Sequence, residues 1–137
     1  MGHGFHKYTS KHQILPQDSI QYLAPSQGPM IEKIISGGQT GADQAALDLA
    51  IEMGIPHGGW VPKGRKTENG RLPDKYQMKE TNAIDYAQRT ELNILDSDGT
   101  LLFSHGKLKG GSALTKNLAA KHNKPCLHID LDELSEY

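Results

Sequence analysis

The sequence predicts an α/β fold, a three-layer Rossmann-like domain with a mostly parallel sheet. From Met30 onward, short apolar runs alternate with helix-length segments. The first run ends in a glycine-rich turn that opens a helix, and a second Gly-Gly pair follows a later strand. Strands that alternate with helices are joined by right-handed crossovers, which make the strands parallel and cover both faces of the sheet.

The first half of the domain shows this alternation directly. Residues 31–36 predict a strand, and residues 40–53 predict a helix, because apolar side chains recur there at helical spacing until Gly54. Residues 55–61 predict a short strand or an extended crossing. Residues 62–80 are rich in Pro, Gly, Lys and Arg and have no period, which indicates a long loop of the kind that often carries function.

The second half repeats the pattern with clearer boundaries. Thr81 or Asn82 is a plausible N-cap for the next helix, and Pro125 breaks the chain before the last strand. The predicted elements are a helix over 81–95, a strand over 100–104, a helix over 112–122, a strand over 126–131 and a turn of helix within 132–137.

Residues 1–29 differ from the rest because they mix His, Pro and Gly with few periodic apolar positions. We expect a tail, a leader segment or an arm that orders on a partner, with the ligand-binding domain over residues 30–137. The histidines His3, His6 and His12 share no helix face, so a solvated tail explains them better than a metal site.

Composition limits the classes of function. A chain of 137 residues forms one domain, and a net charge of −1 argues against general nucleic-acid binding and electrostatic membrane binding. No apolar run approaches the roughly 20 residues that span a bilayer. The single cysteine, Cys126, excludes an internal disulfide and fits a reducing, cytoplasmic location, where we expect it to be a buried structural thiol.

The segment 34–43 is the most informative part of the chain. Three glycines between a strand and a helix allow a ligand to approach the main chain, and the helix N-terminus favours an oxyanion. The spacing is neither that of a P-loop nor that of a dinucleotide fingerprint. A tight structural turn is the alternative. The candidate ligand-binding residues of this first loop are Gly37, Gly38, Gln39, Thr40, Gly41 and Asp43.

Two further loops follow predicted strands, and the carboxyl ends of parallel strands share one sheet edge. The loop after residue 104 contains a second Gly-Gly pair, which adds Gly110, Gly111 and Ser112 as phosphate-binding candidates. In the long loop, Lys63 and Arg65 supply cations, and Trp60 at its entrance offers a stacking face for a heterocycle. A solvated polar loop is the plainer explanation of those charges.

Candidates for catalysis are fewer and less specific. Asp43, Glu91 and Asp98 are carboxylates that could act as a general base, with Arg89 stabilising charge. Arg89 lies four residues after Asp85, so a surface ion pair explains it equally well. No His or carboxylate set has metal-ligand spacing, so we expect no metal site formed by protein ligands.

These motifs together resemble a known family. The runs Ser36-Gly-Gly-Gln-Thr-Gly-Ala-Asp43, Gly54-Ile-Pro-His-Gly-Gly-Trp60, Pro62-Lys-Gly-Arg65, Gln88-Arg-Thr-Glu91, Asp96-Ser-Asp-Gly-Thr100 and Gly110-Gly-Ser112 are similar to the molybdenum-carrier family. That family resembles a circularly permuted branch of the SLOG superfamily, which is Rossmann-like and includes the lonely-guy type phosphoribohydrolases. The resemblance covers residues 30–131.

The resemblance implies binding of a nucleotide-like phosphorylated ligand, with molybdenum cofactor, molybdate or a nucleotide as the possible cofactor. The hydrolase relatives use an arginine and a glutamate on the N-glycosidic bond, but Lys116 and Asn117 stand where that glutamate is expected. A carrier is therefore the first hypothesis. A nucleotide N-glycosidic or phosphoester hydrolase and a nucleotide-sensing signalling module are the alternatives, and a homo-oligomer is expected because so small a domain has shallow clefts.

Overall fold

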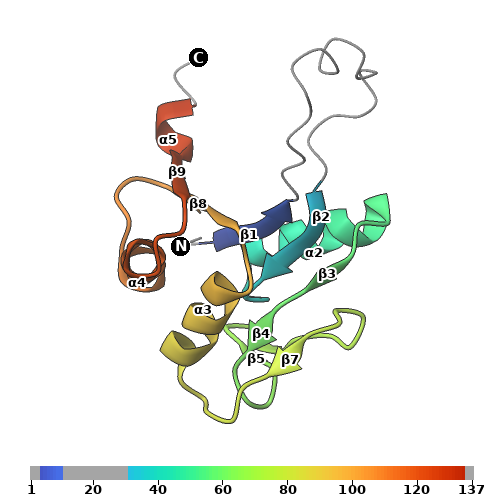
Figure 1. The fold of residues 1–137 in the computed structure, drawn as a ribbon. Coiled ribbons are helices and arrows are strands. Elements are labelled where there is room, and N and C mark those ends of the chain that lie inside the picture. The colour runs from blue at the N-terminus through green and yellow to red at the C-terminus, as the bar shows by residue number, and fades with distance from the viewer. Residues whose placement is uncertain (1–3, 11–30, 135–137) are drawn as a thin grey trace.

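The computed structural model describes residues 4–10 and 31–134 of the chain. It is an α/β domain whose strands and helices alternate along most of its length (Figure 1). In chain order the elements are β1 (Gly4–Ser10), β2 (Ile31–Ser36), α2 (Ala42–Met53), β3 (His57–Gly58), β4 (Trp60–Val61), β5 (Lys66–Thr67), β6 (Gly70–Arg71), β7 (Lys79–Glu80), α3 (Tyr86–Leu95), β8 (Gly99–Ser104), α4 (Gly110–Lys121), β9 (Cys126–Asp130) and α5 (Leu131–Leu134).

The main sheet has five strands in the order β3-β2-β1-β8-β9. β2 runs parallel to β3 and β8 runs parallel to β9, whereas β1 is antiparallel to both of its neighbours, β2 and β8. The four strands other than β1 therefore point the same way, and their carboxyl ends share one edge. This confirms the predicted Rossmann-like fold with a mostly parallel sheet.

Two crossovers leave the centre of this sheet in opposite directions. One is β2–α2–β3 and the other is β8–α4–β9. The right-handed rule for such crossovers predicts that α2 and α4 cover opposite faces. In Figure 1, α2 passes behind β2. The strand order reverses between β2 and β8, and ligands of such sheets bind at the carboxyl ends of the strands at this reversal.

β1 occupies the centre of the sheet, between β2 and β8. The expectation that residues 1–29 form a tail outside the domain therefore needs correction for Gly4–Ser10, while residues 1–3 and 11–30 lie outside the described residues. A central strand covered on both faces usually reads as a continuous apolar run, and Gly-Phe-His-Lys-Tyr-Thr-Ser is not one. Hydrophobic patterning could not identify it.

The helices begin at other residues than the sequence predicted, and α2, predicted from residue 40, begins at Ala42. α3 begins at Tyr86, because the side chain of Asp85 caps it by accepting from Ala87 N at 2.9 Å. The Thr81 hydroxyl instead donates to the carbonyl of Ala83 at 2.8 Å, within the preceding loop. α4 begins at Gly110 rather than at residue 112, so its Gly-Gly pair belongs to the first helical turn.

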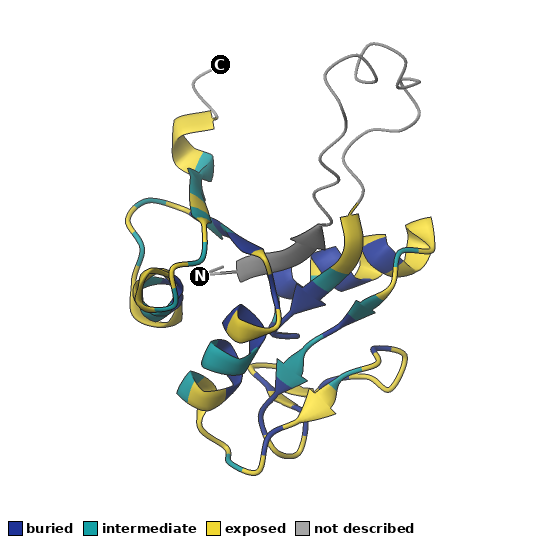
Figure 2. Ribbon diagram, in the orientation of Figure 1, coloured by how far each residue is buried: buried dark blue, intermediate teal, exposed yellow. Residues whose placement is uncertain are grey.

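The buried apolar cluster of the domain joins α2 to the long loop (Figure 2). Leu47 of α2 packs with Val61, Leu72 and Tyr76, and Met78 covers the cluster from outside. Full burial of a leucine or valine side chain contributes about 1.5–3 kcal/mol relative to exposure. The loop is thus a packed part of the domain, and its polar groups are held in fixed positions. Within the described ranges, no helix is long and apolar enough to cross a membrane.

Candidate functional site

The first loop leaves β2 and enters α2 at Gly41, where glycine takes the positive φ of 86°. Two of its N–H groups are already used inside the loop. Gly38 N donates to the Ser36 hydroxyl at 3.2 Å, and Gln39 N donates to Asp43 Oδ2 at 3.1 Å. The Ser36 hydroxyl in turn donates to the carbonyl of Asp43 at 2.9 Å. The loop is therefore organised by its own serine and aspartate.

Asp43 lies in the first turn of α2 and is fully buried. A carboxylate at this position interacts favourably with the helix dipole, as a bound anion would. Asp43 Oδ2 accepts from Gln39 N, so this N–H group of the first loop is bound by the protein itself.

Arg89 of α3 lies against Gly37 and brings its charge next to Asp43. A Cβ on Gly37 would overlap Arg89 Nη1 and would lie 2.9 Å from Asp43 Oδ2. Arg89 is only 5% exposed, and its guanidinium carbon lies 5.5 Å from the centre of the Tyr86 ring. Burial lowers the pKa of Arg89, while the charge of Asp43 opposes that shift. Gly37 is required here because the guanidinium fills the space of a side chain.

Gly38 also makes room for protein atoms. Its φ is 70°, and a Cβ there would lie 2.9 Å from Leu72 Cδ2 and 3.0 Å from Val61 Cγ1. Gly37 and Gly38 therefore allow α3 and the long loop to pack against the end of β2. This favours the structural interpretation of the first glycine pair over close approach by a ligand.

The outer part of the first loop contacts the β5–β6 hairpin. Gln39 Nε2 donates to the carbonyl of Lys66 at 3.1 Å, and the Thr40 hydroxyl donates to Glu68 Oε2 at 3.0 Å. Gly41, by contrast, is exposed. Of the first-loop candidates, Gln39 and Thr40 thus have the hairpin as their partner.

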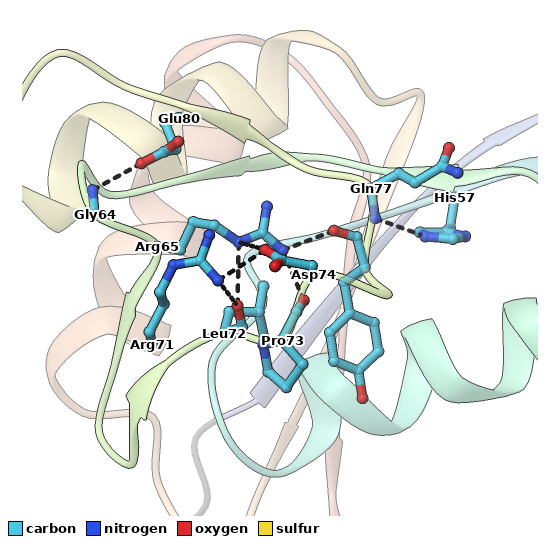
Figure 3. A network of polar contacts seen from close by, with 10 residues as sticks. His57, Gly64, Arg65, Arg71, Leu72, Pro73, Asp74, Gln77 and Glu80 are labelled. Carbon is cyan, nitrogen blue, oxygen red and sulfur yellow. Dashed lines mark hydrogen bonds and ion pairs between the residues drawn. The ribbon is translucent and has the colours of Figure 1, made fainter.

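Arg65 is a buried clamp within the long loop (Figure 3). Its Nε donates to Leu72 O at 3.1 Å, and its Nη2 donates to Pro73 O at 2.8 Å and Tyr76 O at 2.7 Å. The charged group thereby joins both ends of the segment that forms the hairpin. Lys63 is exposed. The expected cationic loop is present, but Arg65 binds backbone carbonyls of the same loop.

Trp60 is held against α3 by three hydrogen bonds. Its N–H donates to Asn93 Oδ1 at 2.7 Å, Asn93 Nδ2 donates to its carbonyl at 3.0 Å, and the indole Nε1 donates to Asp96 Oδ2 at 2.8 Å. The ammonium of Lys79 lies 5.4 Å from the centre of its ring. These contacts explain Trp60 as the connection between β4 and α3, and a stacking role remains a prediction.

The second loop offers a more open helix N-terminus. A Cβ on Gly110 or Gly111 would meet nothing within 4 Å, and the N-cap residue Lys109 makes no side-chain capping bond. The first turn of α4 contains no acidic residue. Ser112 is 1% exposed, and its hydroxyl has no hydrogen-bond partner among the described residues. Lys107 and Lys109 are exposed just before the helix.

The turn that leads to α4 is fixed through Gly106. Asp130 Oδ1 accepts from Gly106 N at 2.9 Å, and the Ser104 hydroxyl donates to Gly106 O at 2.6 Å. Since that hydroxyl uses its proton on Gly106, His128 Nε2, 2.6 Å away, must be the donor to Ser104. The N–H of Gly106 lowers the pKa of Asp130 below its ordinary value.

The remaining catalytic candidates lie elsewhere. Glu91 Oε1 accepts from His122 Nε2 at 2.8 Å and from Lys121 Nζ at 3.3 Å, and these contacts lower its pKa. It therefore joins α3 to the end of α4. Asp98 immediately precedes β8, at the opposite sheet edge from Ser104. The structure brings Asp43 and Arg89 together, but it does not bring Glu91 or Asp98 to them.

Several residues with clear roles were not among the sequence candidates. Ser36, Asn93 and Asp130 bind backbone N–H groups of Gly38, Trp60 and Gly106, and His128 binds the hydroxyl of Ser104. Ser36 and Asp130 stand at or beside strand ends, which is a signal that the sequence contained. Asn93 lies within a helix, and no pattern pointed to its partner. Cys126 is half-buried, and the described ranges contain no cluster of three or more potential metal ligands.

Comparison with known proteins places this geometry in a family. The model of the circularly permutated YpsA SLOG family matches residues 34–137. The crystal structure of a protein named "Putative molybdenum carrier protein", from Syntrophus aciditrophicus SB, is 64% identical in sequence and has a TM-score of 0.76, over 80% of this chain and 70% of that chain. Among curated proteins there is no match.

Proposed function

Because the chain belongs to the circularly permutated YpsA SLOG family, we propose that it binds a small phosphorylated, nucleotide-like molecule as a carrier. The observation that carries the proposal is the N-terminus of α4. It combines two open glycines, two lysines, a first turn without acidic residues and the buried hydroxyl of Ser112, which has no hydrogen-bond partner in the part of the chain that the structure describes. A helix N-terminus of this kind is suited to a phosphate group.

The two glycine loops have unequal roles in this proposal. At the first loop Asp43 and Glu68 accept hydrogen bonds from Gln39 and Thr40, whereas the first turn of α4 contains no acidic residue and two exposed lysines precede it. We therefore assign the phosphate group to Gly110, Gly111 and Ser112. The rest of the ligand would then extend toward the first loop. This refines the expectation that both glycine pairs bind phosphate.

A carrier fits the side chains better than an enzyme does. Glu91 is paired with two cations of α4, and Asp98 lies at the opposite sheet edge. Asp43 is buried beside Arg89 with one oxygen on Gln39 N, so an attacking water has little access to it. A nucleotide hydrolase is the second candidate, because Arg89 and Asp43 do lie together at the carboxyl edge of the sheet.

The name of the related protein from Syntrophus aciditrophicus suggests what the cargo could be. Molybdenum cofactor contains a phosphorylated pterin, which matches a phosphate site beside a hydrogen-bonding loop, and molybdate is an oxyanion. A nucleotide has the same arrangement of phosphate and heterocycle. We further propose that the protein acts in the cytoplasm as a homo-oligomer, since apolar residues such as Leu49 and Met53 are exposed on α2. A nucleotide-sensing role would use the same site.

Calorimetric titration with adenosine 5′-monophosphate, inorganic phosphate and molybdate tests the proposal. We expect Ser112→Ala to weaken binding about tenfold, since a hydrogen bond to a charged group contributes about 1.5–3 kcal/mol. Lys109→Gln should weaken it too, whereas Lys116→Gln, the same charge change farther along α4, should not. Equal effects of the two lysine changes would reject the site.

The hydrolase alternative is tested with the same proteins. Chromatography after incubation with adenosine 5′-monophosphate detects free adenine or adenosine. We expect neither product. Release that persists in Glu91→Gln and is lost in Asp43→Asn would assign an enzyme to the Asp43 and Arg89 pair instead.

A further inference from the structure

The first loop is occupied by a carboxylate from its own chain. Thr40 was expected to offer its hydroxyl to a ligand, yet this hydroxyl donates to Glu68 Oε2 at 3.0 Å. Glu68 lies in the turn between β5 and β6, and neighbouring Lys66 accepts Gln39 Nε2 through its carbonyl at 3.1 Å. The hairpin therefore contacts the loop at two consecutive residues.

The position of Glu68 is determined by a well-ordered turn. The hydroxyl of Thr67 donates to Gly70 O at 2.7 Å and accepts from Asn69 N at 3.1 Å, so the residues on both sides of Glu68 are fixed. Thr67 is only 6% exposed. Arg65 binds the carbonyls of Leu72 and Pro73 just after the hairpin. The backbone that carries Glu68 is therefore held on both sides.

Glu68 and Asp43 differ in how their negative charges are balanced. Asp43 is buried in the same loop and accepts from Gln39 N, and the charge of Arg89 lies beside Asp43. No such balancing partner is shown for Glu68 among the described residues, and Glu68 is exposed. An anionic group that approached Thr40 would therefore meet an uncompensated carboxylate, and like charges at short range disfavour binding.

We propose that Glu68 is a specificity-determining residue that excludes anionic groups from the first loop. The ligand class that fits has phosphate at one end only and hydroxyl or amine groups at the other, because those groups donate hydrogen bonds to Glu68. This inference rests on the proposed phosphate site at α4. It identifies the first loop as the selective end of the site and α4 as the phosphate-binding end.

The test compares Glu68→Gln with Glu52→Gln, an equal change of charge at an exposed position of α2. Each variant is titrated with adenosine 5′-monophosphate and with adenosine 3′,5′-bisphosphate, whose second phosphate lies away from the first. We expect Glu68→Gln to raise the affinity for the bisphosphate relative to the monophosphate by about fivefold at low salt, and Glu52→Gln to leave the ratio unchanged. An equal ratio in both variants overturns the inference.

A second measurement separates this result from a failure of the phosphate site. Thermal unfolding of both variants is followed at increasing concentrations of sodium sulfate. The sulfate ion can approach the first loop without also binding at the phosphate site of α4. If sulfate stabilises Glu68→Gln more than Glu52→Gln, the result supports exclusion of anions by Glu68. If the monophosphate binds neither variant, that second result rejects only the proposed function. Equal stabilisation, with no change in the ligand ratio, rejects the role of Glu68.

Discussion

The guanidinium of Arg89 occupies the space beside Gly37 in which any other residue would place its side chain. Gly37 immediately follows β2 and Arg89 lies on α3, so this contact fixes the helix against the carboxyl edge of the sheet. Asp43 adjoins the same contact from α2. Three segments thus meet at a point where two opposite charges are withdrawn from solvent.

Replacing Gly37 with alanine should destabilise the protein by about 1–3 kcal/mol, because the new methyl group must displace Arg89. Gly111→Ala is the matched control. Its Cβ would meet nothing within 4 Å, and alanine is favoured over glycine in a helix, so its stability should be unchanged or slightly raised. Urea unfolding measures both. A tolerated Gly37→Ala would contradict the packing described for Arg89.

Arg89 and Asp43 should be energetically coupled. Removing one charge of a buried pair costs about 3–5 kcal/mol, because the other charge is left uncompensated. We expect Arg89→Met and Asp43→Asn each to lower the free energy of unfolding, and the double variant to lose less than the sum of the two losses. A double-mutant cycle gives the coupling energy. If the two losses of unfolding free energy were strictly additive, the two charges would not interact.

Asn93 should matter more to stability than the indole group of Trp60. Asn93→Ala removes two hydrogen bonds to backbone groups of Trp60 from a fully buried position, at a cost of about 2–3 kcal/mol. Trp60→Phe removes only the exposed bond to Asp96 and should cost about 1 kcal/mol or less. Chemical unfolding followed by circular dichroism compares them, since Trp60 is the only tryptophan. The reverse order would assign the anchoring role to the ring.

Acid should weaken the contact between α3 and α4. His122 and Lys121 hold the pKa of Glu91 below its ordinary value, so the folded state binds its proton less readily than the unfolded state. The stabilisation is complete above the ordinary pKa and is lost as the pH falls through the lowered one. Unfolding midpoints from neutral pH to about pH 3 should fall less steeply for Glu91→Gln than for the unmodified protein. Parallel slopes would contradict this.

The parallel part of the fold was predictable because its signals are local. Residues 31–36 contain the apolar pair Ile34 and Ile35 and are followed by a glycine pair, and the helix after them has one apolar face, so these local patterns identified both elements. β1 was not predicted, because its place in the sheet depends on its neighbours and its own residues lack an apolar run. The start of α3 was missed for a related reason, since several polar residues there could cap a helix and only Asp85 does.

The candidate site was predictable to a similar extent. The two glycine loops were located correctly at strand ends, and Asp43 and Arg89 were selected by residue type. Their contacts could not be foreseen, because the partners of Gly37, Gly38 and Arg65 come from distant positions. The sequence pattern is the same whether the space beside a glycine is filled by a ligand or by an arginine side chain. Which of them is present depends on tertiary packing.

The central place of β1 also bears on the order in which the molecule assembles. Gly4 pairs with Phe103, so β1 completes its ladder with β8 only after all the elements between them have been made. Contacts of such long sequence separation slow folding, and β1 has an unpaired edge in the meantime. Until β8 arrives, β2 and β3 cannot be joined to the other half of the sheet. The centre of the sheet is therefore completed only when β8 forms, after the elements from β2 to α3 have been made.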